Sequence, residues 1–275
     1  MYEREIDVAR RAAFEAGQVL MRYFRSTDLA VREKGDHGPV TQADLRADAL
    51  IRKALRAAFP DDTLLTEESP REETSAMRRW IVDPMDGTLE FIRGSEDFCV
   101  MIGMTVDTLP ALGVIYPPTA DRMYEGVVGE GAHRVGSMGS PKASRTRLRV
   151  KPIETGESIR LVHSKNHRSR RLAELLERFE FATAFPKGSA GLKCMAILEG
   201  DADVYVHPSR EIKEWDTCAA EALMLAAGGR MSDGNFDPLA YGKSDPRHAR
   251  GIVAHRPGLP PELASVIRDV SPRPD

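Results

Sequence analysis

Apolar residues between positions 3 and 25 recur every three or four residues, as they do on the buried face of a helix. These positions are Ile6, Ala9, Ala13, Ala16, Val19, Leu20 and Tyr23. A polar stretch that contains glycine follows at 32–38, where we expect a loop and a candidate lid over a ligand.

A second helix is predicted from Thr41 to about Phe59, where Pro60 ends it. Thr41 suits the N-cap position. Asp44, three residues later, is placed like the acidic residue of a capping box, with Asp instead of Glu. Asp44 therefore has a purely structural interpretation, because an acidic residue in the first turn stabilises the helix dipole.

Short apolar runs bounded by turn residues then predict strands. A strand at 63–66 and one ending at 80–82 come first, and runs at 97–106, 110–116 and 122–128 indicate an antiparallel meander.

Strands and helices alternate in the second half, which predicts an α/β layer with helices on its faces. The expected strands are 159–162, 182–185 and 204–206, and the expected helices are 169–179, 190–199 and 215–227. Gly228 and Gly229 follow the last helix as a C-terminal cap would, and one more short strand and helix are expected before residue 270.

The Gly-, Ser- and Pro-rich stretch 136–144 is the predicted boundary between two subdomains. We expect an N-terminal α+β subdomain over 1–143, and an α/β subdomain over 144–275 that completes the active site.

Composition narrows the class of protein. With 41% hydrophobic and 29% charged residues, the 275-residue chain is typical of a globular protein, and a net charge of −3 argues against a nucleic-acid binder. Three cysteines without a CxxC pair disfavour a disulfide framework or a zinc site. The charged N-terminus and the lack of an apolar run of about 18 residues predict neither signal peptide nor membrane span, so we expect a cytoplasmic protein.

Candidate chemistry is concentrated at 80–91, which reads WIVDPMDGTLEF. Pro84 biases Asp83 toward an extended backbone and Gly87 permits a sharp turn, so Asp83 and Asp86 are expected to leave a strand end into a tight loop. Two such close carboxylates repel each other unless cations lie between them, and Mg²⁺ prefers oxygen ligands. The alternative is an Asp-Pro turn that precedes a helix N-cap.

Two adjacent glutamates, Glu67 and Glu68, follow the strand at 63–66. Such a pair is mostly a solvated loop when it stands alone. However, Asp83 lies only 16 positions after Glu67, so the two strand ends can sit side by side.

Four motifs, in this order, resemble the inositol monophosphatase superfamily of Mg²⁺-dependent, Li⁺-sensitive phosphatases. They are Val40-Thr41-x-x-Asp44, Glu67-Glu68, the stretch from Trp80 to Phe91, and the segment from Trp215-Asp216 to Gly228-Gly229. The resemblance implies a layered αβαβα sandwich of the inositol monophosphatase and fructose bisphosphatase type. It also implies an active site between an antiparallel sheet and a smaller α/β layer, a small-molecule phosphate substrate and, as in many members, a homodimer.

Position by position, the resemblance implies Mg²⁺ ligands at Glu67, Asp83, the carbonyl of Met85, Asp86 and Asp216. It implies that Thr88, paired with Asp44, polarises the attacking water, which Glu67 helps to hold. Thr88 alone is too weak a base, but a hydrogen bond to Asp44 allows it to orient the water. The main-chain amides around Gly87 and Thr88 are expected to cradle phosphate oxygens.

Three features resemble the 3′(2′),5′-bisphosphate nucleotidases of the bacterial CysQ-like kind. Glu90 stands where inositol-specific members more often carry Asn. The other two features are a GS-x-x-x-K element that includes Ser189 and Lys193, and an S-x-x-H segment that ends at His167. Ser189, Lys193 and His167 are therefore expected to bind the non-scissile part of the substrate. The alternatives are a surface lysine and a loop histidine.

The sequence also departs from these patterns. Tyr205-Val206-His207 stands where inositol monophosphatases place an inositol-binding acidic residue, which weakens that interpretation. Some eukaryotic nucleotidases have Arg there, so His207 leaves recognition of the second phosphate open, with Lys213 as a candidate substitute.

The predicted reaction is Mg²⁺-dependent hydrolysis of 3′-phosphoadenosine 5′-phosphate to AMP and phosphate. The alternatives are hydrolysis of inositol-1-phosphate or another sugar phosphate, and a catalytically silent metal-binding module. The presence of both Thr88 and Asp44 disfavours the silent module, because these residues serve water activation rather than metal holding.

Overall fold

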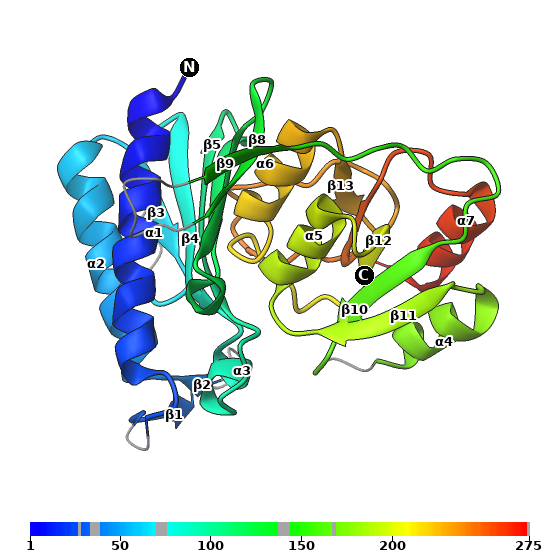
Figure 1. The fold of residues 1–275 in the computed structure, drawn as a ribbon, viewed down its shortest axis with the longest axis horizontal. Helices are drawn as coiled ribbons and strands as arrows, with labels where there is room; N and C mark the ends of the chain where they lie inside the picture. The colour runs from blue at the N-terminus through cyan, green and yellow to red at the C-terminus, as the bar shows by residue number, and fades with distance from the viewer. Residues whose placement is uncertain (27–28, 34–38, 70–75, 137–143, 167–168, 274–275) are drawn as a thin grey trace.

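The elements of the chain stack in five layers (Figure 1). The computed structural model describes residues 1–26, 29–33, 39–69, 76–136, 144–166 and 169–273. From one side to the other, the layers are a helix pair, a seven-stranded sheet, a second helix pair, a five-stranded sheet and a third helix pair. A separate hydrophobic core fills each side of the first sheet, and a third core lies under the outer helices of the second. The predicted αβαβα sandwich is confirmed.

The first helix pair, α1 (Glu3–Tyr23) and α2 (Gln42–Ala58), covers the outer face of the large sheet (Figure 1). The alanines of α1 are buried on this face, as their spacing predicts. α2 begins with the predicted capping box: Thr41 Oγ1 accepts hydrogen bonds from the amides of Ala43 and Asp44, and the Thr41 amide donates to Asp44 Oδ2 at 2.7 Å.

The seven-stranded sheet runs in the order β3-β4-β5-β6-β7-β8-β9. Its strands are β3 (Thr63–Thr66), β4 (Arg78–Asp86), β5 (Cys99–Val106), β6 (Leu109–Tyr116), β7 (Arg122–Val127), β8 (Gly131–Gly136) and β9 (Ser144–Leu148). The predicted meander is confirmed as antiparallel pairing from β4 to β9. β3 lies parallel to β4, so their ends sit side by side as expected. β5 is an almost continuous apolar run because helices cover both of its faces.

One expectation for the segment 80–91 was wrong. β4 does not end near Val82 but continues to Asp86, and its register with β5 shifts between Asp83 and Asp86. Asp83 lies opposite Met101 and Asp86 opposite Cys99, so β4 contains one extra residue here, which is a bulge. Pro84, which has no amide hydrogen for the ladder, is accommodated in this bulge. The sharp turn comes only at Gly87, whose φ is 105° and which precedes α3 (Thr88–Ile92).

The five-stranded sheet has the order β11-β10-β12-β14-β13. Its strands are β10 (Arg160–Ser164), β11 (Thr183–Lys187), β12 (Val204–His207), β13 (Arg230–Asp233) and β14 (Ile252–His255). α5 (Ala190–Glu199) and α6 (Cys218–Ala227) lie between the two sheets, and α4 (Arg170–Arg178) and α7 (Pro261–Val270) cover the outer face (Figure 1). α6 begins later than expected, because residues 215–217 form the turn that precedes it. Gly228 caps it with φ 91°.

Two shorter elements complete the chain, a β1 (Arg32–Glu33) and β2 (Pro39–Val40) ladder and the 3₁₀ turn Pro118–Ala120. The rest of the expected loop at 32–38 lies outside the described residues. The same holds for most of the stretch around the predicted domain boundary. Since β9 pairs with β8, the chain leaves the first sheet only after Leu148, and the division at 143/144 stays a prediction. Within the described ranges, no helix has both the length and the apolar character needed to cross a membrane.

Two glycines allow α6 to lie directly on the seven-stranded sheet. A Cβ atom at Gly113 of β6 would stand 2.2 Å from the carbonyl oxygen of Ala219, and one at Gly103 of β5 would stand 2.6 Å from Cys218 Sγ. Both clashes fall on the first turn of α6. Because backbone cannot move aside as a flexible side chain can, the glycines fix how closely the start of this helix approaches the sheet.

Gly113→Ala is expected to lower the free energy of unfolding by about 1–3 kcal/mol, the usual cost of overpacking a filled interior. Equilibrium urea denaturation measures this loss. Gly136→Ala is the matched control, since a Cβ at this strand position meets, among the described residues, only the Ser144 Oγ atom, at 3.0 Å. Equal stability of the Gly113→Ala variant and the wild type would contradict the close packing of α6.

Candidate active site

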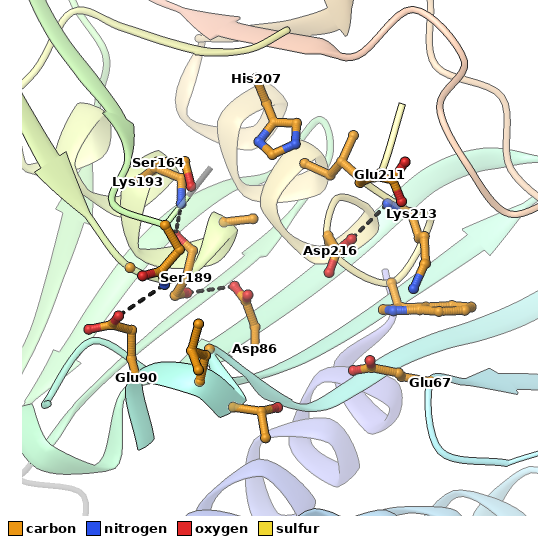
Figure 2. Close-up of a pocket in the computed structure, with 18 of the residues that line it drawn as sticks. Glu67, Asp86, Glu90, Ser164, Ser189, Lys193, His207, Glu211, Lys213 and Asp216 are labelled. Carbon is orange, nitrogen blue, oxygen red and sulfur yellow. Dashed lines mark hydrogen bonds between the residues drawn. The ribbon is translucent and has the colours of Figure 1, made fainter. Parts of the chain in front are cut away.

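A pocket lies between the two halves of the chain, and both contribute side chains to its wall (Figure 2). Glu67, Asp86, Thr88 and Glu90 come from the N-terminal half. From the C-terminal half come residues that include Ser164, Ser189, Lys193, His207, Lys213 and Asp216. Most of the residues singled out in the sequence therefore face one cavity.

Three carboxylates form a compact cluster at this pocket. One oxygen from each of Asp83, Asp86 and Asp216 lies within 4.8 Å of the other two. The β4 bulge supplies Asp83 and Asp86, and the turn before α6 supplies Asp216. Figure 2 shows Asp86 and Asp216 pointing toward each other. The Lys213 amide donates a hydrogen bond to Asp216 Oδ2 at 2.6 Å and fixes its orientation.

Burial and mutual repulsion dominate the electrostatics of this cluster. Burial raises the pKa of Asp83 well above its usual range, and the charges of Glu67, Asp86 and Asp216 raise it further. Burial, followed by the charge of Asp86, raises the pKa of Asp216 to about 7. A cation among these oxygens would relieve the repulsion, and an all-oxygen donor set favours a hard divalent ion. The residues present therefore fit a metal site.

Asp86 also connects the cluster to the C-terminal half. Its Oδ2 atom accepts hydrogen bonds from Ser189 Oγ at 2.5 Å and from the Gly191 amide at 2.8 Å, at the start of α5. Burial raises the pKa of Asp86, while the charge of Lys193 and these hydrogen bonds act in the opposite direction. The hydroxyl of Ser189 is thus engaged with a carboxylate, and its expected contact with substrate stays a prediction.

The remaining predicted ligands lie close to the cluster. Glu67 lines the same pocket but stands outside the compact group of three, although its charge contributes to the raised pKa of Asp83. The carbonyl of Met85 is 3.2 Å from Thr88 Oγ1. Their role as metal ligands stays a prediction.

The predicted pair of Thr88 and Asp44 is in contact. Thr88 Oγ1 donates a hydrogen bond to Asp44 Oδ1 at 3.1 Å. The other oxygen of Asp44 is the one that closes the capping box with Thr41. The structural and the functional interpretations of Asp44 are therefore compatible, because each uses a different oxygen of one buried carboxylate.

Lys193 is not the surface lysine of the alternative interpretation. Its side chain is only 3% exposed, and Nζ donates a hydrogen bond to the carbonyl of Ser189 at 2.7 Å. Nζ also stands over the Tyr205 ring, 5.0 Å from its centroid. Burial lowers the pKa of Lys193, and the nearby charge of Asp86 opposes this shift.

Several other residues bear on the expected second-anion site. His167 lies outside the described residues, so its role stays a prediction. His207 is buried in the pocket wall, with Nδ1 3.4 Å from the hydroxyl of Tyr205. The Nζ atom of Lys213 stands 5.2 Å from the centroid of the Trp215 ring.

The sequence interpretation missed the partners of Glu90. This carboxylate is 1% exposed and accepts hydrogen bonds from Lys165 Nζ at 2.7 Å and Asn166 Nδ2 at 2.9 Å. Although burial acts in the opposite direction, these bonds hold the pKa of Glu90 at about 2. Lys165 and Asn166 follow a strand, and nothing in their local sequence indicated a contact with Glu90, which lies 75 and 76 positions earlier in the chain.

Comparisons with known proteins indicate the family to which the chain is similar. The model of the inositol monophosphatase family matches residues 1–271. A 3′(2′),5′-bisphosphate nucleotidase CysQ from Aggregatibacter actinomycetemcomitans is 31% identical over 256 residues, which are 89% of this chain and 91% of the relative. A histidinol-phosphatase from Chlorobaculum parvum is 32% identical over 230 residues, covering 83% and 85% of the two chains.

Among solved structures, an inositol monophosphatase from Anabaena (Nostoc) sp. PCC 7120 superposes with a TM-score of 0.73 at 27% identity. The match covers 98% of this chain and 97% of that one. The similar proteins thus share a fold and carry names of different phosphatases, so their names do not agree on one substrate.

The melting temperature of Asp83→Asn should lie above that of the wild type without metal and below it with metal. In chelator, the variant should melt several degrees higher than the wild type, because a buried charge beside like charges is removed. About 1 kcal/mol corresponds to roughly 2–4 °C in a chain of this size. Added Mg²⁺ should stabilise the wild type but not the variant. Differential scanning calorimetry measures both effects.

Asp121→Asn, at an exposed position, is the control and should respond to Mg²⁺ as the wild type does. An Asp83→Asn variant that is still stabilised by Mg²⁺ would contradict the assignment of Asp83 as a metal ligand.

Proposed function

We propose that this chain hydrolyses 3′-phosphoadenosine 5′-phosphate to AMP and phosphate with Mg²⁺ as its cofactor. The chain belongs to the inositol monophosphatase family and is a phosphatase of that family. The specific substrate, the metal and the roles of individual residues are the proposal.

The observation that carries the proposal is the division of one pocket into two differently charged regions. The acidic cluster of Asp83, Asp86 and Asp216 would hold cations that attract the scissile phosphate. Lys193, buried in the wall beyond Ser189, provides a positive charge on the other side of Asp86 from Asp216 (Figure 2). A substrate with two phosphates matches this arrangement better than a substrate with one.

In this proposal, Asp83, Asp86, Asp216, Glu67 and the carbonyl of Met85 hold the cations. Bound Mg²⁺ would supply Lewis acidity, polarising the phosphoryl oxygens and lowering the pKa of a water. All of these donors are oxygens, as Mg²⁺ requires.

Thr88 and Asp44 would orient the attacking water. Because Thr88 Oγ1 donates its hydrogen to Asp44, its lone pairs are available to accept a hydrogen bond from that water. As the water gives its proton to Thr88 Oγ1, the Thr88 hydroxyl would pass its own proton to the buried Asp44 carboxylate. Main-chain amides near Gly87 and Thr88 would contact the phosphate.

The similarity to nucleotidases of the CysQ kind supports the choice of substrate, and the similarity to a histidinol-phosphatase makes a substrate panel necessary. The panel measures phosphate release with Mg²⁺ from 3′-phosphoadenosine 5′-phosphate, inositol-1-phosphate, histidinol phosphate, fructose-1,6-bisphosphate and AMP. Strong preference for the bisphosphonucleotide, suppressed by Li⁺, is the expected result. Preference for inositol-1-phosphate or another single phosphate would overturn the proposed substrate.

Thr88→Ala should lower kcat by roughly 100-fold or more, the range for loss of a general acid–base group, while KM changes little. Thr88→Ser keeps the hydroxyl that bonds to Asp44 and should retain most of the activity. Steady-state phosphate release measures both variants. Turnover of Thr88→Ala close to that of the wild type would exclude the water-orienting role.

A further inference from the structure

Glu90 and Asp97 of the N-terminal half hold the ends of two strands of the C-terminal sheet. Glu90 accepts hydrogen bonds from Lys165 and Asn166, which follow β10. Asp97 accepts hydrogen bonds from the Gly188 amide at 3.1 Å and from Lys187 Nζ at 3.3 Å, at the end of β11. β10 and β11 are parallel neighbours, so the two carboxylates bind adjacent strand ends at one edge of the sheet.

The backbone approaches these carboxylates so closely that only glycine fits. A Cβ atom at Gly188 would stand 2.7 Å from Glu90 Cγ and 2.6 Å from Asp97 Cβ. The contact is therefore a packed junction between the two halves, and we call the pair of Glu90 and Asp97 the carboxylate clasp.

The strand ends held by the clasp form pocket wall on the side of Asp86 that faces away from Glu67 (Figure 2). Ser164, Asn166, Gly188 and Ser189 all line the pocket, and Lys193 follows on the first turn of α5. In Figure 2, Glu90 lies on one side of Asp86 and Glu67 lies on the other. The clasp thus holds the side of the pocket that contains Ser189 and Lys193, where the proposed function places the part of the substrate that does not react.

Basic side chains surround the clasp carboxylates. Arg93 donates hydrogen bonds to Glu90 Oε1 at 3.3 Å and to Asn166 Oδ1 at 2.6 Å. Lys165 Nζ lies 3.7 Å from Asp97 Oδ2, and it also contacts Glu90 Oε2. Lys193 lines the pocket itself, whereas Arg93, Lys165 and Lys187 pair with Glu90 and Asp97. The charges of the two clasp carboxylates are therefore compensated and do not cancel the positive charge that Lys193 offers to an anion.

We propose that Glu90 is a specificity-determining positioning residue: by holding Lys165 and Asn166, it sets the wall that receives the non-scissile phosphate of the substrate. This inference rests on the proposed function, because it concerns the second phosphate of a bisphosphorylated nucleotide. Glu90 does not touch the reacting atoms and acts through its two partners.

The experiment compares 3′-phosphoadenosine 5′-phosphate with 3′-AMP, which carries the same scissile phosphate but lacks the 5′-phosphate. Glu90→Gln keeps the shape of the side chain and removes its charge. The variant should raise KM for the bisphosphate roughly tenfold, a size consistent with loosened positioning groups. Its kcat, its kinetics with 3′-AMP and the inhibition constant of inorganic phosphate should remain close to those of the wild type.

Lys165→Gln removes the same contact from its exposed end and serves as the second variant should Glu90→Gln fold poorly. The double variant should be no worse than the more affected single variant, because both substitutions break one interaction. Glu96→Gln is the matched control, since Glu96 is an exposed neighbour that pairs with Arg25 outside the clasp.

The outcomes separate the two proposals. A wild type without preference for the bisphosphate over 3′-AMP would overturn the proposed function and the inference with it. A wild type with this preference, left unchanged in both folded variants, would overturn the inference alone. Equal losses of kcat with both substrates would also overturn it, because a merely structural role would disturb the reacting centre as well.

Discussion

Three like charges confined within 4.8 Å in a buried pocket are the constraint on which the rest of this structure depends. Without a cation, burial raises the pKa values of Asp83, Asp86 and Asp216, and neighbouring carboxylates raise those of Asp83 and Asp216 further. The folded chain therefore carries a free-energy cost at the place where its chemistry would occur. The surrounding hydrogen bonds offset part of this cost. The amides of Met85, Gly191 and Lys213 each donate to one of the carboxylates, so backbone groups orient all three.

The layers explain how these groups meet although Asp216 is far from the other two along the chain. A bulge at Pro84 places Asp83 and Asp86 on one strand, with one extra residue relative to β5. Gly103 and Gly113 then allow the first turn of α6 to touch the same sheet, which brings the turn containing Asp216 to the bulge. The bulge between Asp83 and Asp86 and two glycines on the neighbouring strands β5 and β6 therefore determine the geometry of the cluster.

Local signals in the sequence predicted those parts of the structure that local interactions determine. The periodicity of α1, the capping box of Thr41 and Asp44, and the glycine cap of α6 depend on neighbours in sequence, and all three predictions are confirmed. The path of β4 beyond Val82 depends on pairing with β5, and Pro84 misled the prediction because a bulge can accommodate it. The burial of Lys193 depends on Tyr205 and Asp86 from other elements, so exposure statistics could not predict it. The four motifs located the pocket through the family resemblance, which implies that these separate segments meet, although no single motif contains that contact.

Ser189 shows how the two regions of the pocket are mechanically joined. Its φ of 58° is left-handed, a conformation that costs free energy in a residue other than glycine and persists only where neighbours enforce it. Three interactions do so: the hydroxyl bonds to Asp86 and caps the Leu192 amide, while the carbonyl accepts from Lys193. The same residue therefore contacts the acidic cluster through its side chain and the buried lysine through its backbone. Because both contacts share one constrained residue, a displacement of the lysine wall would be transmitted to Asp86, and the spacing between the acidic and basic regions is fixed by the fold rather than by a substrate.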